Sequence, residues 1–287
     1  LNVEIRDAAY LYGDEEKGPG GLPVRSAGNG LLLLSGGIDS PVASYFTMKR
    51  GARCHFIHFH SFPYTTRSSQ EKVQDLIKVL SKYQFKGRTF FVPFADAQQT
   101  IILNCPEKYR IIVYRRFMMR IAERLAKKLN IPALVTGESL GQVSSQTLEN
   151  LRAIEEVTTL PILRPVIGLD KNEIIKIARV IGTYSISKLP HNDACIRFMP
   201  ENPVIHSNIN DVKRAEKDLD VESLDYIIAN HAEQDHSGAI PDVLKAYPQA
   251  KVVTNNKCKL FLQDHLLVPQ DKFITVYSEL LILKEKH

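Results

Sequence analysis

A turn rich in serine and glycine follows a run of four leucines, and its residues suit the binding of a phosphate group. Leu31–Leu34 predicts a strand buried on both faces, as in the centre of a parallel sheet. The Ser-Gly-Gly sequence at 35–37 lets the backbone turn tightly and approach a ligand. Ser40 is expected to cap a helix that ends near Arg50, with Pro41 at its first position. Free backbone N–H groups and the helix dipole would then converge on one anion.

Asp39 adds a carboxylate beside this turn. A carboxylate in that place can hold Mg²⁺ on a polyphosphate, because Mg²⁺ prefers oxygen ligands and shares them with phosphates. No lysine follows the glycines at the spacing of a Walker A loop, so that class of nucleotide site is excluded. A turn that binds no ligand remains the alternative at this point.

Two further residues have side chains that suit catalysis. Lys171 follows Asp170, which is expected to cap a helix, so its ammonium group would lie at a helix start. Cys195 lies in a polar, charged stretch, where a nearby cation favours the thiolate. The alternatives are a solvated lysine and a small buried cysteine. Cys105, which precedes Pro106, is a weaker candidate for sulfur relay.

A long helix is expected over Glu107–Leu129, and basic side chains recur in it at every fourth position. Residues at this spacing fall on one face of a helix. They are Arg116, Arg120, Arg124 and Lys128. The face either binds the phosphates of an RNA or is simply solvated.

A second group of chemically versatile side chains follows an apolar strand expected at 225–230. It contains four potential metal ligands within six residues: His231, Glu233, Asp235 and His236. In an extended chain the first three share one side, and the fourth lies at the following turn. Mixed imidazole and carboxylate ligands suit iron, zinc or manganese.

The elements that must position the first group alternate between strands and helices. The expected strands are 31–34, 53–59, 89–94, 133–136 and 160–166, and the expected helices are 40–50, 71–83, 107–129, 146–156 and 170–181. This alternation predicts an α/β fold, an open, Rossmann-like parallel sheet with helices on both faces. Ligands of such sheets bind beyond the carboxyl ends of the strands. The turn at 35–37 and a second turn at 137–139 both lie there.

The bulk composition is that of a globular protein, with 44% hydrophobic and 24% charged residues. Residues 1–224 carry 30 Lys and Arg against 24 Asp and Glu, a mild basic excess consistent with a polyanionic partner. Four cysteines far apart, with no C-x-x-C, argue against a zinc ribbon or a disulfide framework and favour a reducing compartment. Because no membrane span or signal peptide is visible either, we expect a cytoplasmic protein without a membrane partner.

Three separated motifs together resemble a known enzyme family. Ser35–Ser40 looks like the PP-loop of the ATP pyrophosphatases, which cleave ATP between the α and β phosphates. With Gly137–Leu151 and Leu163–Ile175, it closely resembles the tRNA 4-thiouridine synthetase (tRNA sulfurtransferase) family over roughly residues 1–220. The resemblance implies that ATP adenylates a tRNA uridine and that sulfur carried as a cysteine persulfide replaces its oxygen. The same family supplies sulfur for the thiazole of thiamine.

The resemblance also implies roles for individual residues. It implies nucleotide binding, with Mg²⁺, by the loop residues Ser35, Gly36, Gly37, Ile38, Asp39 and Ser40, and catalysis by Asp39, Lys171 and Cys195. Gly137, Gln142 and Gln146 are further candidates for the nucleotide site, although the two glutamines could instead contact tRNA or be exposed loop residues without a ligand. Its implied partners are tRNA and a cysteine desulfurase or another persulfide donor, and a homodimer is left open. Residues 1–27 are expected to be a linker or the tail of an N-terminal RNA-binding region, 28–200 the PP-loop domain, and 201–224 a polar connector.

Residues 225–287 resemble a fragment of the metallo-β-lactamase-like domain of flavodiiron proteins, a short α/β segment. There His231 and Glu233 would hold one iron, and Asp235 and His236 the other. Two other functions therefore remain open beside a sulfurtransferase. One is a metal-dependent oxidoreductase of the flavodiiron type, and the other is a catalytically silent protein that binds ATP or RNA.

Overall fold

The computed structural model describes residues 1–13, 18, 20–62, 64, 66–189, 200, 202–219, 226–229 and 237–275. The chain divides into two compact units, Leu1–Leu219 and Asp220–His287. The first unit begins with two short antiparallel strands, β1 (Asn2–Ile5) and β2 (Ala9–Tyr12). In the described part of the chain, no helix has the length and apolar character needed to cross a membrane.

A five-stranded parallel sheet forms the centre of the first unit. Its order is β5-β4-β3-β6-β7, and the strands are β3 (Asn29–Leu33), β4 (Arg53–His60), β5 (Thr89–Pro93), β6 (Leu134–Val135) and β7 (Ile162–Leu163). The central strand β3 pairs with β4 through Leu31↔His55 and with β6 through Leu31↔Leu134. The chain therefore crosses from one half of the sheet to the other beside β3. Open α/β sheets bind ligands at such a reversal of strand order.

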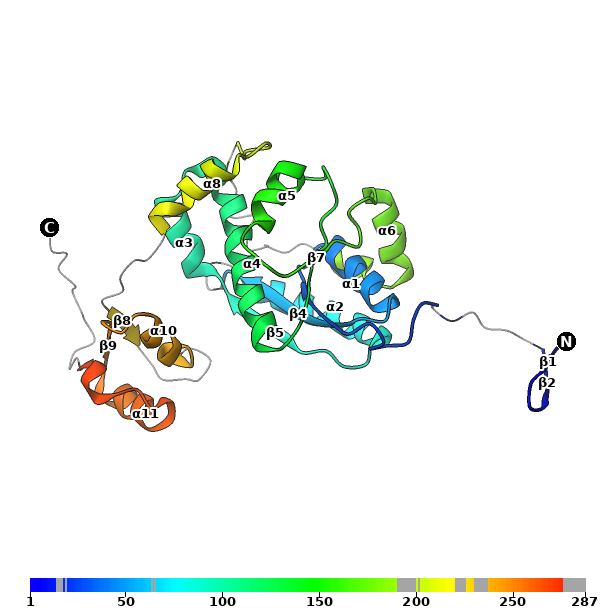
Figure 1. The fold of residues 1–287 in the computed structure, drawn as a ribbon, viewed down its shortest axis with the longest axis horizontal. Coiled ribbons are helices and arrows are strands. Elements are labelled where there is room, and N and C mark those ends of the chain that lie inside the picture. The colour runs from blue at the N-terminus through cyan, green and yellow to red at the C-terminus, as the bar shows by residue number, and fades with distance from the viewer. Residues whose placement is uncertain are drawn as a thin grey trace. The chain divides into compact units, whose positions relative to one another are not determined.

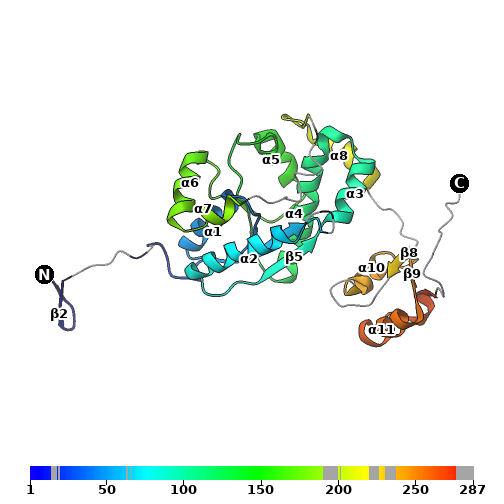
Figure 2. The ribbon, with the colours of Figure 1, turned by 180° about the vertical axis from the view of Figure 1, so that it is seen from behind.

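The four leucines explain why helices cover both faces of this sheet. Successive side chains along a strand point to opposite faces of the sheet. Leu31 packs in one buried cluster, together with side chains of α4 (Arg110–Lys128) and α5 (Leu148–Glu155). Leu32 packs in another, together with side chains of α1 (Asp39–Lys49) and α2 (Ser68–Leu80). Figures 1 and 2 show these layers. The other helices of this unit are α3 (Ala95–Asn104), α6 (Lys171–Val180), α7 (Tyr184–Ser187) and α8 (Ile209–Glu216). The predicted open parallel sheet is confirmed.

Two local predictions about helices were wrong or incomplete. Ser40 does not cap α1: the helix begins at Asp39, its N-cap position is Ile38, and Pro41 is its third residue. The Ser40 hydroxyl instead binds the backbone of the preceding turn. Helix α3 had no predicted counterpart, because its sequence has few apolar residues at helical spacing. It packs on α4 through buried Ile101.

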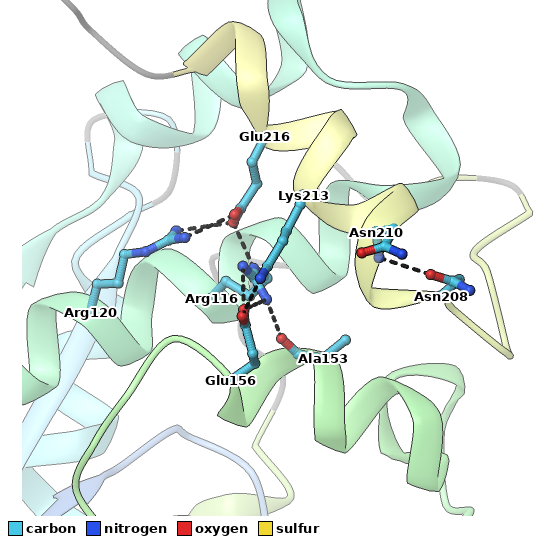
Figure 3. Close-up of polar contacts among 8 residues, drawn as sticks. All are labelled: Arg116, Arg120, Ala153, Glu156, Asn208, Asn210, Lys213 and Glu216. Carbon is cyan, nitrogen blue, oxygen red and sulfur yellow. Dashed lines mark hydrogen bonds and ion pairs between the residues drawn. The ribbon is translucent and has the colours of Figure 1, made fainter.

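The expected basic stripe on α4 is not a continuous exposed face. Arg116 is 1% exposed, and its guanidinium donates to Glu216 of α8 at 2.9 Å and to Glu156 at 3.1 Å (Figure 3). Arg120 donates to both carboxylate oxygens of Glu216, at 3.0 and 2.8 Å. A buried guanidinium needs such partners, because an unpaired charge in the interior is costly. These ionic contacts, together with the 2.5 Å pair between Lys213 and Glu156, are called the α8 clasp below.

The α8 clasp also changes the interpretation of residues 201–224, which were expected to form a polar connector. In the described part of this segment, α8 packs against the first unit, and Val212, Ala215 and Leu219 join its main buried cluster. Burial raises the pKa of Glu216, but the hydrogen bonds and charges of Arg120 and Arg116 outweigh it and hold that pKa below its ordinary value. The helix is therefore an integral part of the first unit.

The second unit contains a three-stranded parallel sheet in the order β10-β9-β8. Its described elements are β8 (Tyr226–Ala229), β9 (Lys251–Thr254), β10 (Phe273–Thr275), α10 (Ile240–Ala246) and α11 (Asn256–Leu266). Asn255 caps α11 by accepting the Cys258 N–H, and Leu262 packs on Val252 in a small buried cluster. The predicted strand at 225–230 is confirmed by β8, whereas His231, Glu233, Asp235 and His236 lie outside the described residues.

Candidate active site

The hydroxyl groups of Ser35 and Ser40 form hydrogen bonds that fix the conformation of the glycine turn after β3. The Ser40 hydroxyl accepts the Ser35 N–H at 3.0 Å, and the Ser35 hydroxyl accepts the Gly37 N–H at 3.2 Å. The two hydroxyls lie 3.2 Å apart. Because α1 starts directly after this turn, its unsatisfied N–H groups and its positive dipole end lie at the same place. The turn thus has features that suit an anion, and its binding role stays a prediction.

Asp39 and Lys171 meet at this anion site although 132 residues separate them in the sequence. The Lys171 ammonium donates to the two carboxylate oxygens of Asp39 at 2.7 and 3.0 Å. Lys171 is the first residue of α6, which is fixed by a capping box between Asp170 and Glu173. Gln142 adds a hydrogen bond from its Nε2 to Asp39 at 2.9 Å. The structure therefore brings together three residues that the sequence analysis assigned to the site.

Gly137 is the point where the second turn touches the first. A Cβ atom at this position would lie 2.6 Å from both N and Cα of Ser40, closer than real contacts allow. Only glycine lets the end of β6 approach the start of α1 this closely. On the opposite side, the Ser187 hydroxyl of α7 donates to the Gly37 carbonyl at 3.1 Å.

A pocket of about 270 Å³ opens beside the glycine turn, and we call it the nucleotide pocket. Its polar lining includes Ser35, Asp39, Ser40, Arg115 and Gln146, and its apolar lining includes Ile57, Phe59, Met118 and Met119. Gln146 is buried, and among the described residues its side-chain oxygen has no hydrogen-bond partner. A pocket with an apolar end, a cation and an anion-binding turn suits a nucleotide.

Arg115 and Glu138 are among the polar residues of this pocket that the sequence analysis missed. Buried Glu138 accepts hydrogen bonds from Arg115 at 2.9 Å, from Arg164 at 2.8 Å and from the Thr136 hydroxyl at 2.9 Å. It joins α4 to the ends of β6 and β7 and fixes the Arg115 guanidinium at the pocket wall. Glu138 follows Gly137 at the expected strand end, which was the available signal. Arg115 directly precedes Arg116 of the basic stripe, and the sequence analysis did not consider it.

Cys54 and Cys105 are buried free cysteines. Burial raises the pKa of the Cys54 thiol to about 12 and that of the Cys105 thiol to about 11, so both stay protonated at neutral pH. Only the thiolate is a good nucleophile. This argues against the sulfur-relay role considered for Cys105, and Cys195 lies outside the described residues. Within the described part of the chain, no group of three His, Cys, Asp or Glu residues is placed to hold a metal ion.

Comparison with known proteins identifies the family of this chain. The model of the family described as thiamine biosynthesis protein (ThiI) matches residues 25–221. The chain belongs to this family. The family match covers the glycine turn, Lys171 and the whole of α8, and it confirms the tRNA sulfurtransferase resemblance predicted from the sequence. It ends before residue 225, so the likeness of 225–287 to flavodiiron proteins stays a prediction.

The ThiI relatives are longer than this chain. A probable tRNA sulfurtransferase of Finegoldia magna is 53% identical over 224 residues, which cover 78% of this chain and 57% of the relative. Another, of Halothermothrix orenii, is 51% identical and is covered to 56%. The crystal structure of a 4-thiouridine synthetase–RNA complex with bound ATP matches with a TM-score of 0.72 and 42% identity, over 76% of this chain and 57% of that one. The chain thus spans a little over half the length of these relatives.

Proposed function

We propose that this chain is the ATP-consuming part of a tRNA sulfurtransferase, which adenylates a tRNA uridine and replaces its oxygen with sulfur. The observation that carries the proposal is the meeting of Asp39 and Lys171 at the start of α1, beside the nucleotide pocket. The likeness to a 4-thiouridine synthetase that was crystallised with RNA and ATP supports it.

The residues of the site divide the chemistry among them. The N–H groups at the start of α1, beside the turn at 35–37, bind the polyphosphate of ATP, and the apolar end of the pocket takes the adenine. Asp39 has the hard oxygen donors that Mg²⁺ requires and already attracts one cation, so it fits a magnesium ion shared with the phosphates. When bound, that ion neutralises phosphate charge. Lys171 stabilises negative charge on the phosphate being transferred.

The reaction has three steps in this proposal. The O4 atom of the uridine attacks the α-phosphorus of ATP, the bond to the β-phosphate oxygen breaks, and pyrophosphate leaves. The N3 proton of the uridine is released to water. Sulfur carried as a persulfide on Cys195, supplied by a cysteine desulfurase or another donor, then attacks C4 and displaces AMP, which leaves C4 joined to Cys195 through an S–S bond. A second thiol attacks the Cys195 sulfur, forms a disulfide with it and releases the uridine with its sulfur on C4. A tRNA substrate and persulfide chemistry support a location in the cytoplasm.

The first measurement is ATP turnover with unmodified tRNA, with AMP and pyrophosphate as the products to be measured. Asp39→Ala is expected to lower the rate of AMP formation by about 100-fold or more, because it removes a charged group at the reacting phosphates. Asp75→Ala is the matched control, since Asp75 is an exposed aspartate of α2 paired only with Lys78 among the described contacts. Full AMP formation in Asp39→Ala would contradict the proposal.

A further inference from the structure

A second pocket, of about 470 Å³, lies between the turn at 139–142 and the segment that leads into α6. The two sides are joined by a hydrogen bond from the Leu140 N–H to the Ile167 carbonyl at 2.9 Å. Gln142 and Lys171 both line this pocket, and both bind the carboxylate of Asp39, which lines the nucleotide pocket. Asp39 therefore links the second pocket to the nucleotide pocket through its contacts with Gln142 and Lys171.

Gln142 presents a hydrogen-bond acceptor that the protein leaves unused. A carboxylate only accepts hydrogen bonds, so the amide nitrogen of Gln142 must face Asp39 and its oxygen must point elsewhere. That Oε1 atom is buried and has no hydrogen-bond partner within the described part of the chain. A buried polar atom without a partner is costly, and a ligand that donates to it removes the cost. Beside it, Leu140 is 48% exposed and offers an apolar surface.

We propose that this second pocket binds the uracil ring of the target uridine, with its N3–H donated to Oε1 of Gln142 and its face against Leu140. The proposal rests on the proposed function and adds the site of the second substrate to it. Uracil carries a donor at N3, whereas cytosine carries an acceptor there, so Gln142 would accept the first base and repel the second. The ring would lie next to Lys171, whose ammonium binds the Asp39 carboxylate of the nucleotide pocket.

The test separates binding of tRNA from binding of ATP. Gln142→Ala is expected to lower kcat/KM for unmodified tRNA by about 5- to 10-fold, the effect of one lost hydrogen bond, and to change the Kd for ATP by less than this factor. The variant should also lower the ratio between kcat/KM for tRNA with uridine at the target position and kcat/KM for a transcript with cytidine there. Gln70→Ala, on α2, is the matched control. Leu140→Trp should fill the pocket and raise KM for tRNA, whereas Leu103→Trp, at an exposed position of α3, should not.

The outcomes distinguish the two proposals. If the unsubstituted chain forms no AMP with tRNA, the proposed function fails. If it forms AMP, and Gln142→Ala and Leu140→Trp keep its kcat/KM for tRNA and its preference over cytidine, the uracil pocket is refuted. If Gln142→Ala changes the Kd for ATP but not kcat/KM for tRNA, Gln142 acts on Asp39 and the nucleotide. That result also refutes the uracil pocket.

Discussion

Substitution of Gly137 by alanine tests whether the close contact between the two turns builds the site. The added Cβ would lie 2.6 Å from backbone atoms of Ser40 and 2.9 Å from the carbonyl carbon of Asp39. Ordinary contacts begin at 3.4 Å, so the end of β6 and the start of α1 must separate by about 0.8 Å. Backbone atoms cannot rotate away as a flexible side chain can. The shift is expected to cost about 1–3 kcal/mol of stability.

The same shift moves the anion-binding turn relative to Gln142 and the rest of the second turn. A displacement near 1 Å costs on the order of 100-fold in rate, so AMP formation should fall by that factor while the chain stays folded. Calorimetric titration with ATP and thermal unfolding measure the two effects separately. Gly13→Ala is the control, because a Cβ at Gly13 meets no atom within 4 Å. Unchanged ATP affinity, rate and stability in Gly137→Ala would refute the packing argument.

Three further predictions concern the α8 clasp and the cysteines. Glu216→Ala should lower the free energy of α8 opening by about 2 kcal/mol, seen as roughly 30-fold faster amide exchange in α8, whereas Lys213→Ala, which removes an exposed partner, should change it little. Because the folded-state pKa of Glu216 lies below its ordinary value, its charge stabilises the fold above that ordinary value, and this contribution is lost as the pH falls through the folded-state pKa. Acid unfolding of Glu216→Gln should therefore depend less on pH, and an identical profile would contradict this. Alkylation of the folded protein at pH 8 should leave Cys54 and Cys105 unmodified, as mass spectrometry can verify; rapid labelling of either would show that it is not buried as described.

Local signals in the sequence were sufficient to predict the sheet and the position of the glycine turn at its edge. Leu31–Leu34 has the continuous apolar character of a central parallel strand, and the turn at 35–37 follows it directly. Asp170 and Glu173 are three residues apart, and the structure shows the capping box that this spacing allows. Such features depend only on neighbouring residues, so the sequence displays them.

Contacts between distant parts of the chain were not predictable in the same way. Arg116 has the spacing of an exposed stripe, and only Glu216, 100 residues later, explains why it is buried. The pairing of Asp39 with Lys171 depends on how β3, β6 and β7 order themselves in the sheet, which periodicity does not reveal. Ser40 had the residue type of a helix cap, but its hydroxyl binds the turn before it. Tertiary contacts overrode the local preference in each case.

The strand order has a consequence for how the chain acquires its site during synthesis. β3 finds its first neighbour, β4, some 20 residues downstream, but its second neighbour, β6, is about 100 residues downstream. Contacts between distant segments form late, because closing a long loop costs entropy before the contact is made. A nascent chain halted before β6 would therefore contain the glycine turn with one side of β3 uncovered, and it would lack Gly137, Gln142 and Lys171. Affinity for ATP would arise only after this second half of the sheet has docked, so that nucleotide binding reports completed folding.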